Sequence, residues 1–132
     1  MTLKQIFLIN TDLKMTCGKI CAQVAHAETL YMESVMMDYA DIEHQYDAFT
    51  DRYFAWKDDS VKPIGLMKKI VLKATEQQIK DIILILAMNN IQHYIVYDLG
   101  LTQLKNGSLS CLCTEPIEEE ISNKLFKHLK LL

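Results

Sequence analysis

A strand, a loop and a helix follow one another in the stretch that decides the fold, residues 4–27, KQIFLINTDLKMTCGKICAQVAHA. Its first part, Lys4–Asn10, is a short apolar run with β-branched and aromatic residues, which predicts a strand. Thr11–Cys17 is predicted to be a loop, and a helix is expected from Gly18 onward. The alanines at positions 22, 25 and 27 are small enough to let this helix lie close to a sheet.

The alternation of strands and helices continues beyond residue 27. Short apolar runs predict further strands at 69–74, 92–97 and 108–114. A helix separates the first two of these strands, because Thr75–Gln78 has the pattern of a capping box and Asn89-Asn90 ends the apolar periodicity. The last two strands are joined by about ten residues without a helical pattern, so we expect them to be antiparallel.

A final helix is expected near Pro116, with Glu118, Glu119 and Glu120 in its first turn, where the helix dipole favours negative charge. The order of elements predicts an α/β fold, in which helices cover both faces of a mixed sheet of four strands.

Length and composition fit one soluble domain that covers residues 1–132. Half of the residues are apolar, and no stretch approaches the roughly 20 apolar residues of a membrane-spanning helix. The N-terminus leads directly into the first strand and shows no signal peptide. We therefore expect a cytoplasmic protein with no membrane partner.

Acidic residues are concentrated in one part of the chain. Residues 28–59 contain nine acidic side chains and only two basic ones, a net charge of −7, whereas the remaining residues carry 12 basic and 8 acidic side chains, or +4. Ala40–Trp56 in this part has weaker helical periodicity, and we interpret residues 40–66 as an acidic helical insert with a solvated face. The mildly basic remainder is suited to meeting a phosphate backbone.

The four cysteines lack the paired spacing of a zinc ribbon. Cys111 and Cys113 are two apart in a predicted strand and therefore share a face. For these two and for Cys17 and Cys21 we expect reduced, mostly buried thiols, with metal or redox chemistry as the alternative. No metal site and no cofactor is predicted.

Three polar residues form a line on the first predicted helix. Lys19, Gln23 and His26 are spaced i, i+4 and i+7, which places them on one face. Periodicity alone favours a structural interpretation, in which Gln23 and His26 bond to neighbouring loops. Gly18 permits close approach of a ligand, and a helix start attracts anions. Because Lys19 opposes the helix dipole there, its presence favours a functional site.

Asp98 directly follows the third predicted strand, and ligands in open α/β sheets gather at the carboxyl ends of strands. Asp12 and Lys14, at the end of the first strand, lie on the same side if these two strands are parallel. An aspartate in this position is often a turn or cap residue, so both a structural and a catalytic role remain open.

Several kinds of active site are excluded. Cys17 and His26 are nine residues apart, about 13 Å along a helix and on opposite sides of it, so they form no dyad. The chain has no Gly-x-Ser-x-Gly elbow, no His-Glu-x-x-His motif and no Gly-rich phosphate loop. A single Trp56 and scattered tyrosines make no stacking platform for RNA.

Four blocks of the chain stand out together, Thr11–Ala27, Lys69–Lys73, Tyr97–Gly107 and Leu129–Leu132. In content and order they resemble the second, archaeal and eukaryotic type of peptidyl-tRNA hydrolase. The first block is similar to that family's Asp-Leu-Lys-Met-x-x-Gly-Lys-x-x-Ala-Gln-x-x-His-Ala pattern. The third is similar to its Asp-x-Gly-x-Thr-Gln-x-x-x-Gly loop.

The resemblance implies a three-layer α/β/α fold with a four-stranded mixed sheet. It also implies metal-independent hydrolysis of the ester between a peptide and the terminal ribose of tRNA, and it is compatible with a homodimer. The family's active residues fall on Lys19, Asp98, Thr102 and Ser110, the last a Thr-to-Ser departure. Supporting residues fall on Gly18, Gln23, His26, Gly100 and Gln103, and the residues expected to meet the tRNA acceptor end are Lys14, Lys19 and Lys105.

In the expected mechanism, Asp98 orients or deprotonates the attacking water. Thr102 and Ser110 donate hydrogen bonds to carbonyl or ribose oxygens, and Lys19 stabilises the oxyanion or a terminal phosphate.

Two departures from the family concern positive charge. Many members have lysine where this chain has Cys17 and arginine where it has Leu101. Each lost phosphate contact weakens RNA binding and flattens its salt dependence. Together with the acidic insert, these departures motivate an alternative, a catalytically weakened member that acts as a protein- or RNA-binding module.

Overall fold

The computed structural model describes residues 2–43, 47–58, 66–99 and 107–132. The strands in these ranges are β1 (Leu3–Asn10), β2 (Lys69–Ala74), β3 (His93–Asp98), β4 (Ser108–Thr114) and β5 (Ile117–Glu118). The helices are α1 (Cys17–Ala40), α2 (Ala48–Lys57), α3 (Glu76–Met88) and α4 (Glu119–Phe126), with a short 3-10 turn, η1 (Thr11–Leu13).

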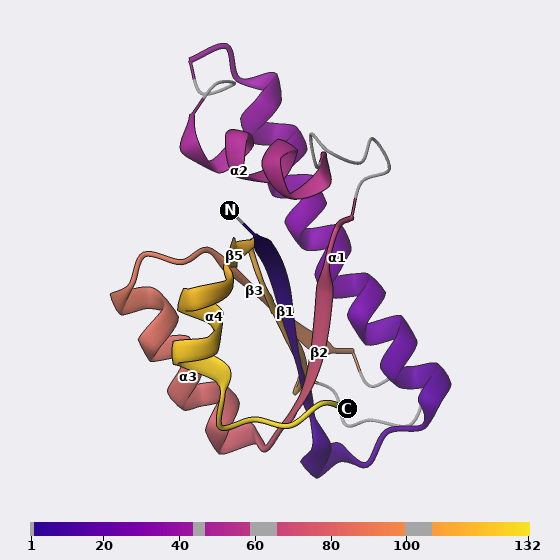
Figure 1. The fold of residues 1–132 in the computed structure, drawn as a ribbon. Coiled ribbons are helices and arrows are strands. Elements are labelled where there is room, and N and C mark those ends of the chain that lie inside the picture. Colours follow the sequence, from indigo (N-terminus) through magenta and orange to yellow (C-terminus); the bar gives the residue numbers. More distant parts are fainter. Residues whose placement is uncertain (1, 44–46, 59–65, 100–106) are drawn as a thin grey trace.

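Four strands form a mixed sheet in the order β2-β1-β4-β3 (Figure 1). β1 pairs parallel with β2 and antiparallel with β4, and β4 pairs antiparallel with β3. The predicted mixed sheet and its antiparallel last pair are therefore confirmed, and the two-residue β5 is added beside the start of β1. Because β1, β2 and β3 all run in one direction, their carboxyl ends lie at the same edge of the sheet.

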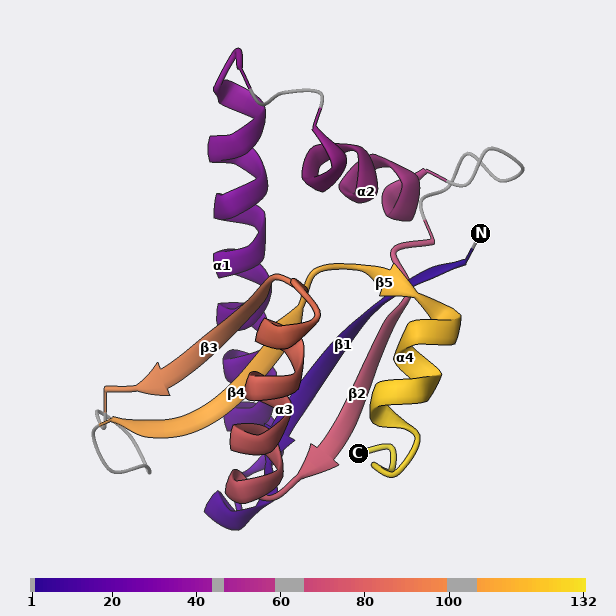
Figure 2. The ribbon, with the colours of Figure 1, turned by 90° about the vertical axis from the view of Figure 1, so that its left-hand side faces the viewer.

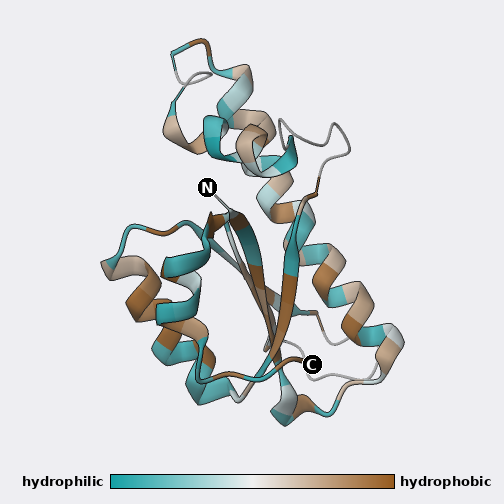
Figure 3. Cartoon of the chain, viewed as in Figure 1, coloured by the Kyte–Doolittle hydropathy of each residue, from teal (hydrophilic) through white to brown (hydrophobic). Residues whose placement is uncertain are grey.

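Helices cover both faces of the sheet, as predicted: α1 and α2 lie on one face, and α3 and α4 on the other (Figures 1 and 2). Alternate residues of β1 build the two cores. Ile6 and Leu8 belong to the core under α3 and α4, whereas Phe7 and Ile9 belong to the core under α1 and α2. Figure 3 shows hydrophobic stretches along the central strands and alternating hydrophilic and hydrophobic segments on the helices.

Local chemistry sets several helix boundaries. The predicted capping box of α3 is present, because the Thr75 hydroxyl accepts from the backbone of Gln78 and the Gln78 side chain accepts from the backbone of Thr75. Asp47 caps α2 by accepting from the backbone N–H of Thr50.

Several boundaries differ from the prediction. α1 begins at Cys17 rather than Gly18, and Asp98 is the last residue of β3 rather than the first residue of the following loop. α4 begins at Glu119, because Ile117 and Glu118 first pair with the start of β1. The N-terminal turn of α4 therefore contains Glu119 and Glu120, while Glu118 is its N-cap.

The chain's last residues pair with the outer edge of β2. Lys73 donates its backbone N–H to the carbonyl of Lys130 over 2.8 Å, and Leu132 donates to the carbonyl of Val71 over 3.0 Å. A bridge between Leu72 and Leu131 joins the same segments. This pairing covers an edge that would otherwise expose unpaired backbone groups.

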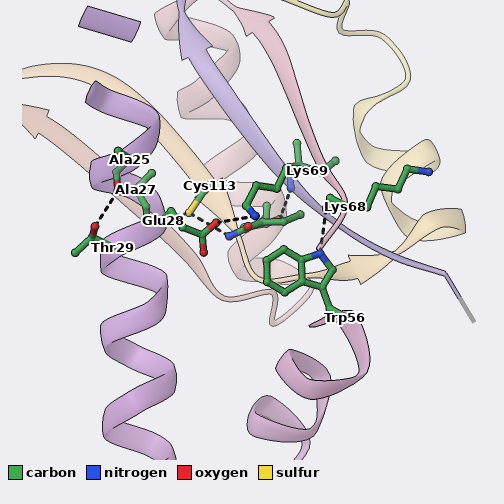
Figure 4. A network of polar contacts seen from close by, with 11 residues as sticks. Ala25, Ala27, Glu28, Thr29, Trp56, Lys68, Lys69 and Cys113 are labelled. Carbon is green, nitrogen blue, oxygen red and sulfur yellow. Dashed lines mark hydrogen bonds and ion pairs between the residues drawn. The ribbon is translucent and has the colours of Figure 1, made fainter. Parts of the chain in front are cut away.

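The segment interpreted as an acidic insert contributes α2, which packs beside α1 and the start of β1. Figure 4 shows its anchor, Trp56, whose indole N–H donates to the carbonyl of Lys68 over 3.0 Å. The ammonium of Lys69 lies 4.8 Å from the centre of the Trp56 ring and 3.9 Å from the carboxylate of Glu28. Four acidic side chains of this part of the chain are exposed, Asp41, Glu43, Asp51 and Asp58.

Candidate functional site

A groove of about 560 Å³ lies between α1 and β3, at the carboxyl edge of the sheet. The residues of α1 that line it are Lys19, Gln23, His26, Thr29 and Leu30. The facing wall is formed by Ile95, Val96, Tyr97, Asp98 and Leu99. The helical line predicted from spacing and the aspartate at the strand end therefore face each other across one groove.

A buried ion pair closes one end of this groove. Lys19 Nζ lies 2.6 Å from Asp98 Oδ2, and the two side chains are only 13% and 7% exposed. Lys19 is in the first turn of α1, where the positive end of the helix dipole opposes its charge. The Asp98 carboxylate compensates this charge. Removing one member of so desolvated a pair leaves the other uncompensated, which in proteins costs about 3–5 kcal/mol.

Gln23 extends the pair into a chain of hydrogen bonds. Its buried amide donates from Nε2 to Asp98 Oδ2 over 3.3 Å and accepts at Oε1 from the hydroxyl of Ser110. The same hydroxyl lies 3.2 Å from the backbone carbonyl of Val96. Ser110 is fully buried, so that its contacts are with Gln23 and the sheet rather than with the groove. The polar chain runs Ser110–Gln23–Asp98–Lys19.

A β-bulge aims Ser110 at this chain. Val96 pairs with Cys111 and Tyr97 pairs with Leu109, so Ser110 is an extra residue between them. Leu109 and Leu112 face the core under α3, whereas Cys111 faces the core under α1. Without the extra residue, strict alternation would turn Ser110 toward α3. The bulge instead presents the Ser110 hydroxyl to Gln23 on α1.

The base of the loop after β3 is closed by a backbone hydrogen bond. Gly107 donates its N–H to the carbonyl of Asp98 over 2.6 Å. Gly107 has a φ of +82°, a conformation that suits glycine best. The end of β3 and the start of β4 are thus held together at Asp98.

The structure describes some of the other candidate residues and not others. Thr102, Gly100, Gln103 and Lys105 lie outside the described residues. His26 is exposed on the groove wall, and its imidazole makes no hydrogen bond to another residue in the described ranges. Gly18 is exposed, with open space where a Cβ would lie, so the packing of the described residues does not require a glycine there. Lys14 is exposed beyond η1, with a φ of 49°.

Asp12 has a structural partner. Its carboxylate accepts the backbone N–H of Glu76 over 2.9 Å at the start of α3. Asn10 in turn accepts from the backbone of Asp12 and donates to the carbonyl of Leu109. The residues at the end of β1 and in η1 thus join β1, α3 and β4.

Sequence reasoning missed the apolar part of the groove. Thr29 and Leu30 follow His26 at i+3 and i+4, so the helical line could have been extended to them. No comparable sequence pattern indicates that Ile95 and Tyr97 line the groove, because alternation along a strand does not show which strand lies at the edge of the sheet.

The burial of the cysteines differs from the expectation that all four are mostly buried. Cys111 and Cys113 are buried on one face as predicted, but Cys17 and Cys21 are exposed on α1, so only half of the cysteines are buried. Burial raises the pKa of the Cys111 thiol to about 12. Among the described residues, no group of three or more His, Cys, Asp or Glu side chains is arranged to hold a metal ion. None of the helices in the described ranges combines the length and apolar character that a bilayer crossing requires.

Comparisons with known proteins agree with the motifs. The family model described as peptidyl-tRNA hydrolase PTH2 matches residues 3–132. A peptidyl-tRNA hydrolase of Thermoplasma acidophilum is 32% identical over 133 residues, covering the whole of both chains. One of Haloquadratum walsbyi is 32% identical over 130 residues, 98% of this chain and 99% of that protein. The "Probable peptidyl-tRNA hydrolase 2" of Dictyostelium discoideum is 31% identical over 129 residues, but this chain spans only 54% of its length.

Proposed function

The chain belongs to the peptidyl-tRNA hydrolase PTH2 family, and from this premise we propose that the Lys19–Asp98 end of the groove is where it cleaves peptidyl-tRNA. The reaction is hydrolysis of a carboxylic ester. Water adds to the ester carbonyl, the bond to the ribose oxygen breaks, and that oxygen takes up a proton. The products are a peptide with a free carboxyl group and a tRNA with a free terminal ribose.

The observation that carries the proposal is the buried ion pair at the end of a groove that is otherwise largely apolar. Asp98 is the carboxylate in reach of a water that attacks an ester held there, and it orients this water and accepts its proton. Lys19 stabilises the negative charge that develops on the carbonyl oxygen or contacts the terminal phosphate. Thr102 donates to the carbonyl or to a ribose oxygen.

Gln23 and Ser110 act as positioning residues in this proposal. Gln23 holds the carboxylate of Asp98 by a hydrogen bond to Oδ2, and Ser110 fixes the orientation of the Gln23 amide. His26 lines the groove one turn farther along α1 and supports the bound ester from that wall. Gly18, Gly100 and Gln103 shape the approach to the ester.

We propose that the acceptor end of tRNA enters at the carboxyl edge of the sheet, where Lys14 and Lys105 contact its phosphates. The protein is further proposed to work in the cytoplasm, as one domain with a helical insert, and as a homodimer, which light scattering in solution tests. The alternative of a binding module without activity is not favoured by the family match.

Hydrolysis of N-acetyl-aminoacyl-tRNA tests the assignment of the site. The Asp98→Asn variant keeps the shape of the side chain and is expected to lose about 100-fold or more in kcat. The matched control is Lys124→Ala, an exposed lysine on α4 across the sheet, which should stay within about twofold of the wild type. Near-wild-type turnover by Asp98→Asn with the fold intact would place the active site elsewhere.

A further inference from the structure

We infer that the outer edge of β3 binds the peptide part of the substrate as an added strand, parallel to β3. This inference rests on the proposed function, since it assumes that the ester lies at Asp98. It assigns to backbone groups of β3 a role in holding the peptide.

The backbone directions along β3 follow from three hydrogen bonds on its inner side. The carbonyl of Gln92 accepts from the backbone of Glu115, and the carbonyl of Asp98 accepts from that of Gly107. The carbonyl of Val96 lies 3.2 Å from the hydroxyl of Ser110. Even-numbered residues thus direct their backbone groups toward β4. Since alternate residues of a strand point in opposite directions, Ile95 and Tyr97 direct theirs outward.

Within the described ranges, no strand pairs with this outward side of β3. β3 is the last strand in the order β2-β1-β4-β3, and Figure 2 shows it at the margin of the sheet. Ile95 and Tyr97 both line the groove that leads to Asp98. An edge strand with unpaired N–H and C=O groups is a template for pairing with another extended chain.

The position of the ester fixes the direction of the bound peptide. The peptide is esterified through its C-terminal carboxyl group, and Asp98 stands at the C-terminal end of β3. A peptide that extends from Asp98 toward Ile95 therefore runs parallel to β3. At roughly 3.3 Å per residue, three peptide residues cover the distance from Asp98 to Ile95.

The chemistry of the groove fits a peptide better than RNA. Apart from Lys19 at the catalytic end and His26, the described side chains that line it are uncharged or, in Asp98, negative. Leu30 and Leu99 supply exposed apolar surface. Main-chain hydrogen bonds depend little on side-chain identity, which suits an enzyme whose peptide substrates differ in sequence.

Two tripeptidyl-tRNAs of the same sequence test the inference, one with normal amides and one with every peptide amide N-methylated. N-acetyl-aminoacyl-tRNA, too short to reach Ile95, reports the basal reaction. For the wild type we expect kcat/KM to be about tenfold higher for the normal tripeptide than for the methylated one, the effect of one or two lost hydrogen bonds. Equal kcat/KM values would overturn the inference while leaving the proposed function intact. Absence of hydrolysis of all three substrates would remove both.

A substitution in β3 tests whether this strand pairs with the substrate peptide. Ile95→Pro removes an outward N–H, a substitution that edge strands tolerate. We expect it to bring the two tripeptides to within about threefold of each other. The matched control is His93→Pro, which also removes an outward N–H, at the first residue of β3 and outside the groove, and should keep the discrimination.

Undiminished discrimination by Ile95→Pro would overturn the inference. So would conversion of a wild-type dimer to a monomer by Ile95→Pro with discrimination retained, since that result would assign the edge to a second copy of the chain.

Discussion

At the scale of residues, the buried amide of Gln23 links the polar side chains of the site. Gln23 contacts Asp98 on one side and Ser110 on the other, and it is 1% exposed. The spacing of Lys19, Gln23 and His26 predicted their shared face, because helical geometry depends on sequence separation alone. It could not predict the link to Ser110, which arises from a bulge between two strands.

Ser110→Ala tests this link. It leaves a buried acceptor of Gln23 without its donor, so we expect the free energy of unfolding to fall by about 1–3 kcal/mol. A freer Gln23 should also lower kcat while leaving KM nearly unchanged. Urea denaturation and steady-state hydrolysis measure the two effects. Ser110→Thr, which keeps the hydroxyl, is the rescue control, and a loss in Ser110→Thr equal to that in Ser110→Ala would contradict the role of the hydroxyl.

Glu28 predicts a pH dependence of stability. Burial raises the pKa of its carboxyl above the ordinary value of 4.5, against the opposing effect of Lys69. The folded state then binds more protons than the unfolded state between the ordinary and the raised pKa, so this contribution to stability is lost as pH rises through that window. Relative to Glu28→Gln, the wild type should become less stable from about pH 4.5 upward in urea titrations. A difference that stays constant with pH would contradict this. The exposed Glu33→Gln on the same helix is the matched control.

At the scale of elements, sequence patterns within a few residues predicted helix starts well. The state of the sheet edges could not be predicted from such patterns. The capping box placed the start of α3 correctly, because both of its partners are within four residues. The start of α4 was predicted too early, because the pairing of Ile117 with the distant β1 decides it. For the same reason, the free edge of β3 and the covered edge of β2 could not be recognised, since both depend on contacts between remote segments.

Asp12, in the 3-10 turn η1, stabilises the start of α3. It accepts from the first backbone N–H of α3, which has no partner within the helix. Asp12→Ala should therefore lower the free energy of unfolding by about 1 kcal/mol, as loss of a helix cap does. Asp12→Asn keeps an acceptor oxygen and should lose clearly less. Equal stabilities of Asp12→Ala and the wild type in urea denaturation would show that the contact contributes nothing.

At the scale of the whole molecule, the length of α1 separates the acidic residues beyond its C-terminal end from the site. Lys19 lies in the first turn of α1 and Ala40 ends the helix, and 21 intervening steps correspond to about 30 Å. This distance exceeds the screening length of about 8 Å at physiological ionic strength, so the exposed Asp41 and Glu43 beyond the end of α1 have little effect on a phosphate beside Lys19. The net charge of the acidic part suggested an obstacle to RNA, and the fold places these two of its carboxylates at the far end of the helix.

The most direct test of a shared site at Lys19 and Asp98 is single-turnover hydrolysis of N-acetyl-aminoacyl-tRNA. The rates are compared for the wild type, Lys19→Ala, Asp98→Asn and the double variant. If Lys19 and Asp98 act as one unit, each single variant should lose about 100-fold or more, and the double variant should lose little beyond the worse of the two. Rates within about threefold of the wild type for either folded single variant, or losses that multiply in the double variant, would contradict a shared site built on this ion pair.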